Sequence, residues 1–249
     1  MTFRAALARL RDAQKTARGV SLYSRYVNRP AGRVCAAAAH RAGLTPNGVT
    51  AASALLSLAG VAAVALLPPS WPLAAGVWAA LAGGFALDAA DGQLARLCGT
   101  GSPAGEWLDH AVDCAKITAL HTAVLIAFHR HFALPDDGWL LVPPVFQLAH
   151  IMIFFGGLLA DKLTPRPAAP PPHAPPPSRL RALALLPADY GTLCALFLLL
   201  GDEGLFRAAY AVLAGVYVVF CAAFSVRWFR ALSAAGAAGS ASAASAARR

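Results

Sequence analysis

The chain has 249 residues, of which 58% are apolar and only 13% charged, with a formal net charge of +9 at pH 7. Soluble domains are about 45–50% apolar and about 25% charged, so this composition excludes a soluble globule, a disordered chain, a collagen and a disulfide scaffold. The mean hydropathy of +0.56 predicts an all-α membrane protein with several spanning helices. The basic surplus is typical of cytoplasmic loops that face anionic headgroups, and no nucleic-acid partner is expected. The five cysteines lack ligand spacing, which indicates neither zinc nor disulfides.

The first 43 residues are basic and contain scattered apolar side chains. They hold nine Lys or Arg residues but a single acid, Asp12, with residues such as Leu7, Leu10 and Val34 interspersed. This pattern predicts an amphipathic segment over residues 1–43 whose helices lie in the headgroup layer. A solvated basic tail is the alternative. No apolar run of signal-peptide type follows the basic residues, so no signal peptide is expected.

Six apolar stretches follow, and a membrane crossing needs about 20 such residues. The stretches cover residues 49–67, 73–87, 108–127, 139–159, 182–200 and 205–225. Together they predict a domain of six transmembrane helices over residues 44–230. A Pro-rich loop over residues 164–180 and a low-complexity, disordered tail over residues 231–249 complete the predicted organisation.

The distribution of basic residues predicts the topology. Six spans place both termini on the same side of the membrane. Arg130 is the only Lys or Arg in the loops on the opposite side, with Arg207 just inside the sixth span. Because Lys and Arg favour the cytoplasmic side, we expect a multi-pass protein of the cell membrane with both termini and the Pro-rich loop in the cytoplasm.

Four aspartates between the second and third stretches suggest a metal site. Asp88 and Asp91 are three residues apart and Asp109 and Asp113 are four apart, so each pair lies on one helix face. The run 97–104 contains Gly and Pro and predicts a turn that brings the two helix ends together. Two carboxylates about 5 Å apart repel by roughly 3 kcal/mol at an effective dielectric near 20. Divalent ions would offset this repulsion, and oxygen ligands favour Mg²⁺ or Mn²⁺.

Two further residues support a phosphate ligand at this place. Gly92 follows Asp91 and would let a bulky ligand approach the helix backbone. Arg96 lies one turn further on and could pair with a phosphate. Two metal ions that bridge a phosphate are typical of phosphoryl transfer. Each residue also has an ordinary alternative, Gly92 as a helix-packing contact and Arg96 as an anchor at the membrane surface.

The spacing of these residues resembles that of a known protein family. Residues 88–113 read DAADGQLARLCGTGSPAGEWLDHAVD and fit D-x2-D-G-x2-A-R-x8-G-x3-D-x3-D at every fixed position. This pattern resembles the signature of the CDP-alcohol phosphotransferase (CDP-alcohol phosphatidyltransferase) family. The segment LTPNGVT, residues 44–50, is similar to the one that enters the first span in that family, and six spans agree with it.

The resemblance implies a role for each matched position. The carboxylates would bind two Mg²⁺ ions, with Mn²⁺ as the alternative, and Asp113 would also be the general base. The implied metal ligands are Asp88, Asp91, Asp109 and Asp113. The implied contacts to the CDP moiety are Asn47, Gly48, Val49, Thr50, Gly92, Arg96 and Ser102. Ala95 and Gly105 would be structural positions of the motif, and a homodimer is the common state in the family.

The implied reaction moves a phosphatidyl or other substituted phosphate group from a CDP-alcohol to an alcohol acceptor and releases CMP. CDP-diacylglycerol with a small polar alcohol, in phospholipid biosynthesis, is the expected pair because it is frequent in the family. Members that use inositol phosphate commonly carry Arg after the last motif aspartate, where this chain has Cys114. Residues 24–30, SRYVNRP, are nevertheless similar to the N-terminal arm of enzymes that use CDP-inositol, which is the alternative donor.

Two other functional classes fit the pattern less well. Aspartate-rich prenyltransferases also bind magnesium pyrophosphate, but their acidic motifs lie far apart and lack the D-G-x2-A-R element. A transporter or cation channel predicts acids in several spans, whereas Asp189 is the one further candidate. Asp189 and Tyr190 could contact the acceptor. His110 is expected to bond between helices rather than to join the site.

Overall fold

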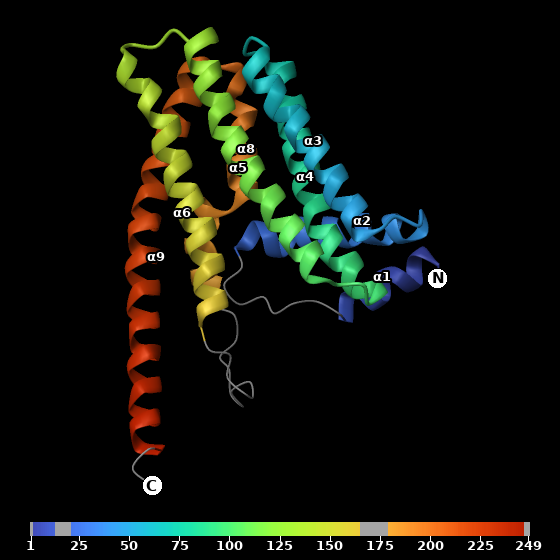
Figure 1. The fold of residues 1–249 in the computed structure, drawn as a ribbon. Coiled ribbons are helices and arrows are strands. Elements are labelled where there is room, and N and C mark those ends of the chain that lie inside the picture. The colour runs from blue at the N-terminus through green and yellow to red at the C-terminus, as the bar shows by residue number, and fades with distance from the viewer. Residues whose placement is uncertain (1, 13–20, 165–178, 247–249) are drawn as a thin grey trace.

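The protein is almost entirely helical in the computed structural model, which describes residues 2–12, 21–164 and 179–246. Long helices form a bundle, and a layer of short helices lies across one end of it (Figure 1). No strand occurs within the described ranges. The predicted all-α class is therefore confirmed.

Within the described residues, five long helices make up the bundle, and capping residues explain where three of them begin. Thr45, Ser70 and Ser102 each accept a hydrogen bond from the backbone N–H three residues on, with a proline in the first turn. One helix ends at Gly99, whose φ of 69° is a left-handed conformation suited to glycine. The long helices are α3 (Pro46–Leu66), α4 (Trp71–Cys98), α5 (Pro103–His131), α6 (Val142–Leu163) and α9 (Glu203–Ala246).

The N-terminal layer packs its apolar side chains against α4. Leu10 and Ala36 of the layer are buried in one cluster with Ala90. Gly32 permits the close approach, because a Cβ there would meet the Cβ of Ala89 at 2.8 Å. The amphipathic pattern thus serves contact with the bundle, and a position in the headgroup layer stays a prediction. The layer consists of α1 (Phe3–Asp12), the π-helix η1 (Ser24–Asn28) and α2 (Arg29–Arg41).

Five segments in the described part of the chain are long and apolar enough to cross a membrane. The sixth predicted span is not shown, because the stretch 182–200 does not form one continuous helix. Pro187 lies in a short 3₁₀ turn, and the Asp189 side chain then caps a new helix. The apolar helical run Tyr190–Gly201 is consequently shorter than a span. This segment contains α7 (Arg179–Ala184), η3 (Leu186–Ala188), α8 (Tyr190–Leu196) and η4 (Phe197–Gly201).

The long helices alternate in direction (Figure 1). α3 leads away from the N-terminal layer, α4 returns to it, and α5 and α6 repeat this course. α8 and η4 pack on α4 and α9 and return the chain to the end where α9 begins. α9 then runs back, so its C-terminal end and the N-terminal layer lie towards the same end of the bundle.

The predicted C-terminal tail and the predicted Pro-rich loop each lie at an edge of the described residues. α9 continues to Ala246 and so includes residues 231–246, which were expected to be a disordered tail. Alanine has the highest intrinsic helix propensity, and this segment is rich in it. Most of the predicted Pro-rich loop, residues 165–178, lies outside the described residues.

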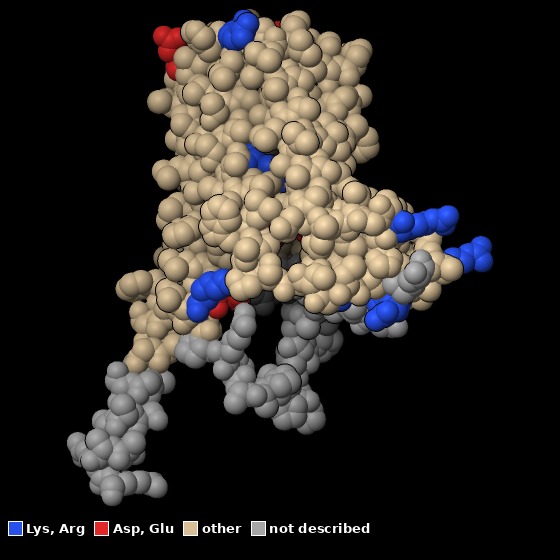
Figure 2. Space-filling model, turned by 45° about the vertical axis from the view of Figure 1, so that its right-hand side comes forward, with Lys and Arg blue, Asp and Glu red and all other residues tan. Residues whose placement is uncertain are grey.

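The outer face of the bundle is mostly apolar. Figure 2 shows few charged side chains over the upper bundle, whereas Lys and Arg project around the N-terminal layer. Leu55, Leu148 and Val212 are among the exposed apolar residues. Many exposed apolar side chains on a surface with few charges indicate contact with lipid, in agreement with a multi-pass membrane protein.

A buried polar network joins α5, α6 and α9. The His121 ring lies between the Tyr210 hydroxyl, 2.6 Å from Nδ1, and the Nδ1 atom of His150, 3.1 Å from Nε2. The Phe146 ring packs against His121 with 4.3 Å between ring centroids. Hydrogen bonds across helices stabilise bundles in lipid, so these histidines have a structural role.

The G84A variant tests the close contact between α3 and α4. A Cβ at Gly84 would overlap Ser57 Oγ and lie 3.2 Å from the Ser53 carbonyl oxygen, so the helices must separate. We expect the free energy of unfolding to fall by about 1–3 kcal/mol, measured as a lower melting temperature in detergent. The control G76A, on the same helix with no neighbouring atom within 4 Å, should not lower it. Equal melting temperatures would contradict the close contact.

Candidate active site

The turn between α4 and α5 places acidic residues from both helices at one end of the bundle. Asp88 and Asp91 lie in the last three turns of α4, and Asp109 and Asp113 lie in the first three turns of α5. The Nζ atom of Lys116 is 2.6 Å from Asp88 Oδ1 and 3.3 Å from Asp113 Oδ1. The two helices therefore bring Asp88 and Asp113 to a single ammonium group.

Asp91 lies one turn nearer the end of α4 and is hydrogen-bonded to α3. Thr50 Oγ1 donates to Asp91 Oδ2 at 2.6 Å, and the backbone N–H of Gly92 donates to Oδ1 at 2.5 Å. Only 5% of Asp91 is exposed, so these bonds fix the direction of its carboxylate. Thr50, a predicted nucleotide contact, is thus also the donor that orients a predicted metal ligand.

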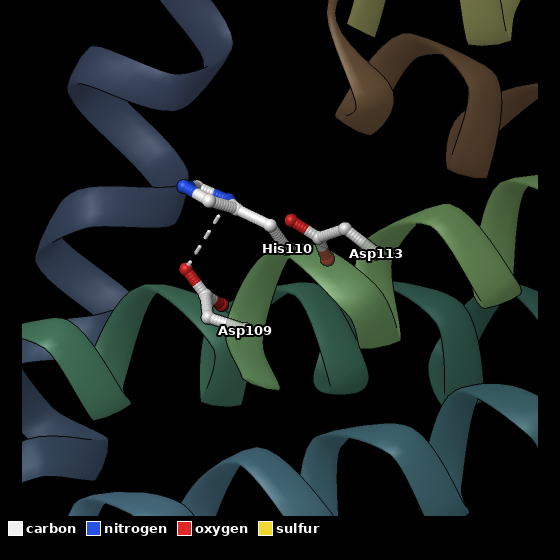
Figure 3. Close-up of side chains that lie close together, drawn as sticks. All are labelled: Asp109, His110 and Asp113. Atoms are coloured by element: carbon white, nitrogen blue, oxygen red, sulfur yellow. Dashed lines mark ion pairs between the residues drawn. The ribbon is translucent and has the colours of Figure 1, made fainter. Parts of the chain in front are cut away.

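Asp109, His110 and Asp113 form a group on α5 (Figure 3). Each offers one ligand atom, and these atoms lie within 4.8 Å of one another. His110 Nδ1 is 3.9 Å from Asp109 Oδ2, while the ring packs edge-on against Phe154 of α6. Within the described residues, His110 therefore touches α6 only through its ring, because its Nδ1 atom has no hydrogen-bond partner, and it lies beside the carboxylates rather than bonding between helices as expected.

A pocket of about 800 Å³ opens beside the carboxylates, between the start of α3 and the turn from α4 to α5. Asp91 and Asp109 contribute to its wall. Asp88 and Asp113 are three or four residues further into the bundle, which is about one helical turn. The predicted nucleotide contacts in its lining are Asn47, Thr50, Gly92, Arg96 and Ser102, together with the motif residues Ala95 and Gly105.

Two predicted nucleotide contacts lie outside this lining. The Gly48 N–H donates to Thr45 Oγ1 at 3.1 Å and so belongs to the cap of α3. Val49 is 2% exposed and packs in the cluster beneath the pocket. Their side of α3 turns away from the pocket, because consecutive residues of a helix point in different directions.

The motif glycine Gly105 lies close to two of the predicted nucleotide contacts. A Cβ at this position would lie 3.3 Å from both Asn47 Oδ1 and Ser102 Oγ. At Gly92 a Cβ would meet Arg96 Nη1 at 3.5 Å, an ordinary contact. Gly105 therefore lies tightly against polar groups of the pocket, whereas a side chain at Gly92 would not be crowded by its neighbours.

A comparison with protein families agrees with the motif and its geometry. A family model described as CDP-alcohol phosphatidyltransferase matches residues 43–170. The chain belongs to the CDP-alcohol phosphatidyltransferase family. The match covers just over half of the chain and extends well past residues 44–50 and 88–113, which carry the resemblance. As a member of this family, the chain is an enzyme that transfers a phosphatidyl-type group from a CDP-alcohol in phospholipid synthesis.

A similar fold occurs in a solved structure, the crystal structure of Mycobacterium tuberculosis phosphatidylinositol phosphate synthase (PgsA1) with CDP-DAG bound. The two chains are 21% identical with a TM-score of 0.52, and the alignment covers 83% of this chain and 93% of that chain. At this identity the likeness shows the shared fold. No curated protein matches the sequence.

In this CDP-alcohol phosphatidyltransferase, the N-terminal layer adds basic residues to the edge of the site. Arg29 interacts electrostatically with Arg96, which lines the pocket. Burial and the nearby Arg25 guanidinium lower the pKa of Arg29 from its usual value. Guanidinium groups that repel one another attract an anion. The sequence analysis did not assign Arg25 and Arg29 to the site, although the resemblance of residues 24–30 was a signal for them.

Asp189, expected as an acceptor contact, has a structural role in the family fold seen here. Its carboxylate accepts hydrogen bonds from Ser21 Oγ, from Ser24 Oγ at 2.5 Å and from the Gly191 N–H at 2.7 Å. These bonds cap α8 and attach the N-terminal layer to the bundle. Tyr190 follows Asp189 and lies within electrostatic range of the aspartates of α4 and α5.

The donor set fits a hard divalent cation, as the family's metal dependence requires. Asp109, His110 and Asp113 offer two carboxylate oxygens and a nitrogen within 4.8 Å of one another, and carboxylate oxygens are the ligands that Mg²⁺ and Mn²⁺ prefer. The sequence analysis did not assign Lys116 to the site, yet its ammonium contacts two of the four motif carboxylates. One lysine compensates one formal charge of the four, so the site still favours divalent ions.

The T50V variant removes the hydroxyl that donates to Asp91 while keeping the shape of the side chain. A buried acceptor without its donor costs about 1–3 kcal/mol, so the melting temperature should fall in detergent. T118V is the matched control, since that hydroxyl donates to the Cys114 carbonyl of its own helix at 2.9 Å; its effect should stay within about 0.5 kcal/mol. A T50V protein as stable as T118V would show that the bond to Asp91 is dispensable.

Proposed function

We propose that this enzyme transfers the phosphatidyl group of CDP-diacylglycerol to a small polar alcohol and releases CMP. The observation that carries the proposal is the pocket of about 800 Å³ that joins the predicted CDP contacts to the aspartates. CDP-diacylglycerol is supported as the donor because the solved structure of similar fold has CDP-DAG bound. The pocket also lies at the end of an apolar bundle, where acyl chains can stay in the lipid.

The lining of the pocket suits the CDP moiety. Arg96 supplies a cation for the phosphates. Asn47 and Ser102 offer polar groups on either side of Gly105, and Gly92 leaves room for the ligand beside α4. The proposed metal ligands are the four motif aspartates, which would hold two Mg²⁺ ions, or Mn²⁺. Ions bound there would neutralise the pyrophosphate and polarise the reacting phosphorus.

Asp113 is the proposed general base. Its carboxylate accepts the proton of the acceptor hydroxyl, and the acceptor oxygen forms a bond to the β-phosphorus. The bond between that phosphorus and the bridging oxygen breaks, and CMP leaves with the electron pair. Asp113 lies about one turn deeper than the pocket wall formed by Asp109, so the acceptor is expected on the bundle side of the donor.

A CDP-inositol-type phosphotransferase is the second candidate. Residues 24–30 form η1 and the start of α2, and this segment places Arg29 within electrostatic range of Arg96, with Arg25 near Arg29. Additional guanidinium groups would suit a donor and an acceptor alcohol that together carry one phosphate more than CDP-diacylglycerol and a plain alcohol. Product analysis with labelled CDP-diacylglycerol and CDP-inositol, each offered plain and phosphorylated alcohols, distinguishes the two candidates.

The proposed setting is the cell membrane, with the active site and both termini in the cytoplasm. The gathering of Lys and Arg around the N-terminal layer supports this orientation (Figure 2), because basic residues favour the cytoplasmic side. A homodimer is proposed from the family resemblance alone.

The D113N variant removes the proposed base with little change in size. CMP release should fall at least about 100-fold, measured by chromatography of the nucleotide product from protein that remains folded in detergent. The control D137N, in the loop between α5 and α6, should keep the wild-type rate. Full activity in D113N would remove the assignment of Asp113 as the base.

Removal of divalent ions should stop the reaction of the wild-type enzyme. After dialysis against EDTA, CMP release from CDP-diacylglycerol should fall by at least about 100-fold, because the phosphate charge is no longer neutralised. Added Mg²⁺ or Mn²⁺ should restore it. Undiminished CMP release in the presence of the chelator would contradict the metal role of the aspartates.

A further inference from the structure

Lys116 places a buried ammonium group between the carboxylates of the site. Only 4% of the residue is exposed. Its Nζ atom is 2.6 Å from Asp88 Oδ1, 3.0 Å from Ser53 Oγ and 3.3 Å from Asp113 Oδ1. Three partners match the three N–H donors of an ammonium. They come from α3, α4 and α5, the helices that form the site.

The surroundings of Lys116 indicate a specific electrostatic role. A buried charge is costly unless it is paired and hydrogen-bonded, and ionisable residues inside membrane bundles usually have a function. Ser53 donates its own proton to the Gly84 carbonyl at 2.8 Å, so its oxygen is available to accept from Lys116. The lysine contacts both Asp88 and Asp113, two like charges that lie close enough to interact with each other.

We propose that Lys116 is an internal counter-cation that competes with a divalent ion for Asp88 and Asp113. The inference rests on the proposed metal role of these aspartates. A divalent ion and an ammonium cannot both approach the same carboxylate oxygen without strong repulsion. The ammonium stands on a flexible four-carbon stem and can move aside, whereas the aspartates are fixed on two helices.

Two consequences follow for the protein before and after metal binding. In the metal-free protein Lys116 keeps the two helix ends together. When an ion binds, Lys116 has to leave Asp88 and Asp113, so the affinity for the ion is lower than these carboxylates alone would give. Lys116 is therefore expected to stabilise the metal-free protein and to weaken metal binding at the same time.

The test measures metal binding and stability rather than turnover. Mn²⁺ binding to the full-length wild-type and K116M proteins is measured by titration calorimetry in detergent, and melting temperatures are measured in EDTA and in Mn²⁺. K116M should bind Mn²⁺ at least about tenfold more tightly, because a unit charge a few ångströms away is removed. Its melting temperature should also be lower than that of the wild type in EDTA and should rise more when Mn²⁺ is added.

The K162M variant is the matched control. Lys162 forms a 2.5 Å ion pair with Glu106, but about half of each side chain is exposed. Exposed ion pairs contribute little to stability, so K162M should change neither Mn²⁺ affinity nor the melting temperature in EDTA. An effect of K162M equal to that of K116M would overturn the inference.

The remaining outcomes separate this inference from the proposed function. Unchanged or weaker Mn²⁺ binding by K116M would overturn the role of Lys116 and leave the metal site in place. No Mn²⁺ binding by the wild-type protein would overturn both. If K116M does not fold, the double variant K116M/D113N removes one charge of each sign, and it should bind Mn²⁺ at least about tenfold more tightly than D113N.

Discussion

The repulsion among carboxylates at two neighbouring helix ends is the constraint on which the rest of this structure depends. Four aspartates on α4 and α5 are useful to a phosphoryl-transfer enzyme only if they stay close together, and like charges oppose this. The structure counters the repulsion with neighbouring groups. Thr50 fixes Asp91 through a buried hydrogen bond, and the Lys116 ammonium joins Asp88 to Asp113.

The helices beneath the site are held in place by contacts that suit a lipid environment. Small residues let α3 approach α4 at Gly84, and a histidine–tyrosine network ties α5, α6 and α9 together. The N-terminal layer closes the lower end and is attached through Asp189. Because lipid provides little hydrophobic drive between helices, close packing and buried polar bonds must position the site.

The family motif and the pocket involve the same residues. The motif residues that line it come from the start of α3, the end of α4 and the turn before α5, so residues far apart in the sequence surround one pocket. Asp91 and Asp109 lie in the pocket wall, and Asp88 and Asp113 lie about one helical turn further into the bundle. A nucleotide at the polar end and a lipid chain along the apolar bundle would each meet the surroundings they require.

The amino-acid sequence by itself determined the helical class and the family, because these depend on composition and on local spacing. It also indicated the turn that brings the aspartates together. Only the tertiary structure decided that residues 182–200 form a broken helix, that Asp189 holds the N-terminal layer, and that Lys116 and Arg29 join the site. These features depend on side chains from distant helices meeting in space, and the spacing of residues along one helix carries no information about such contacts.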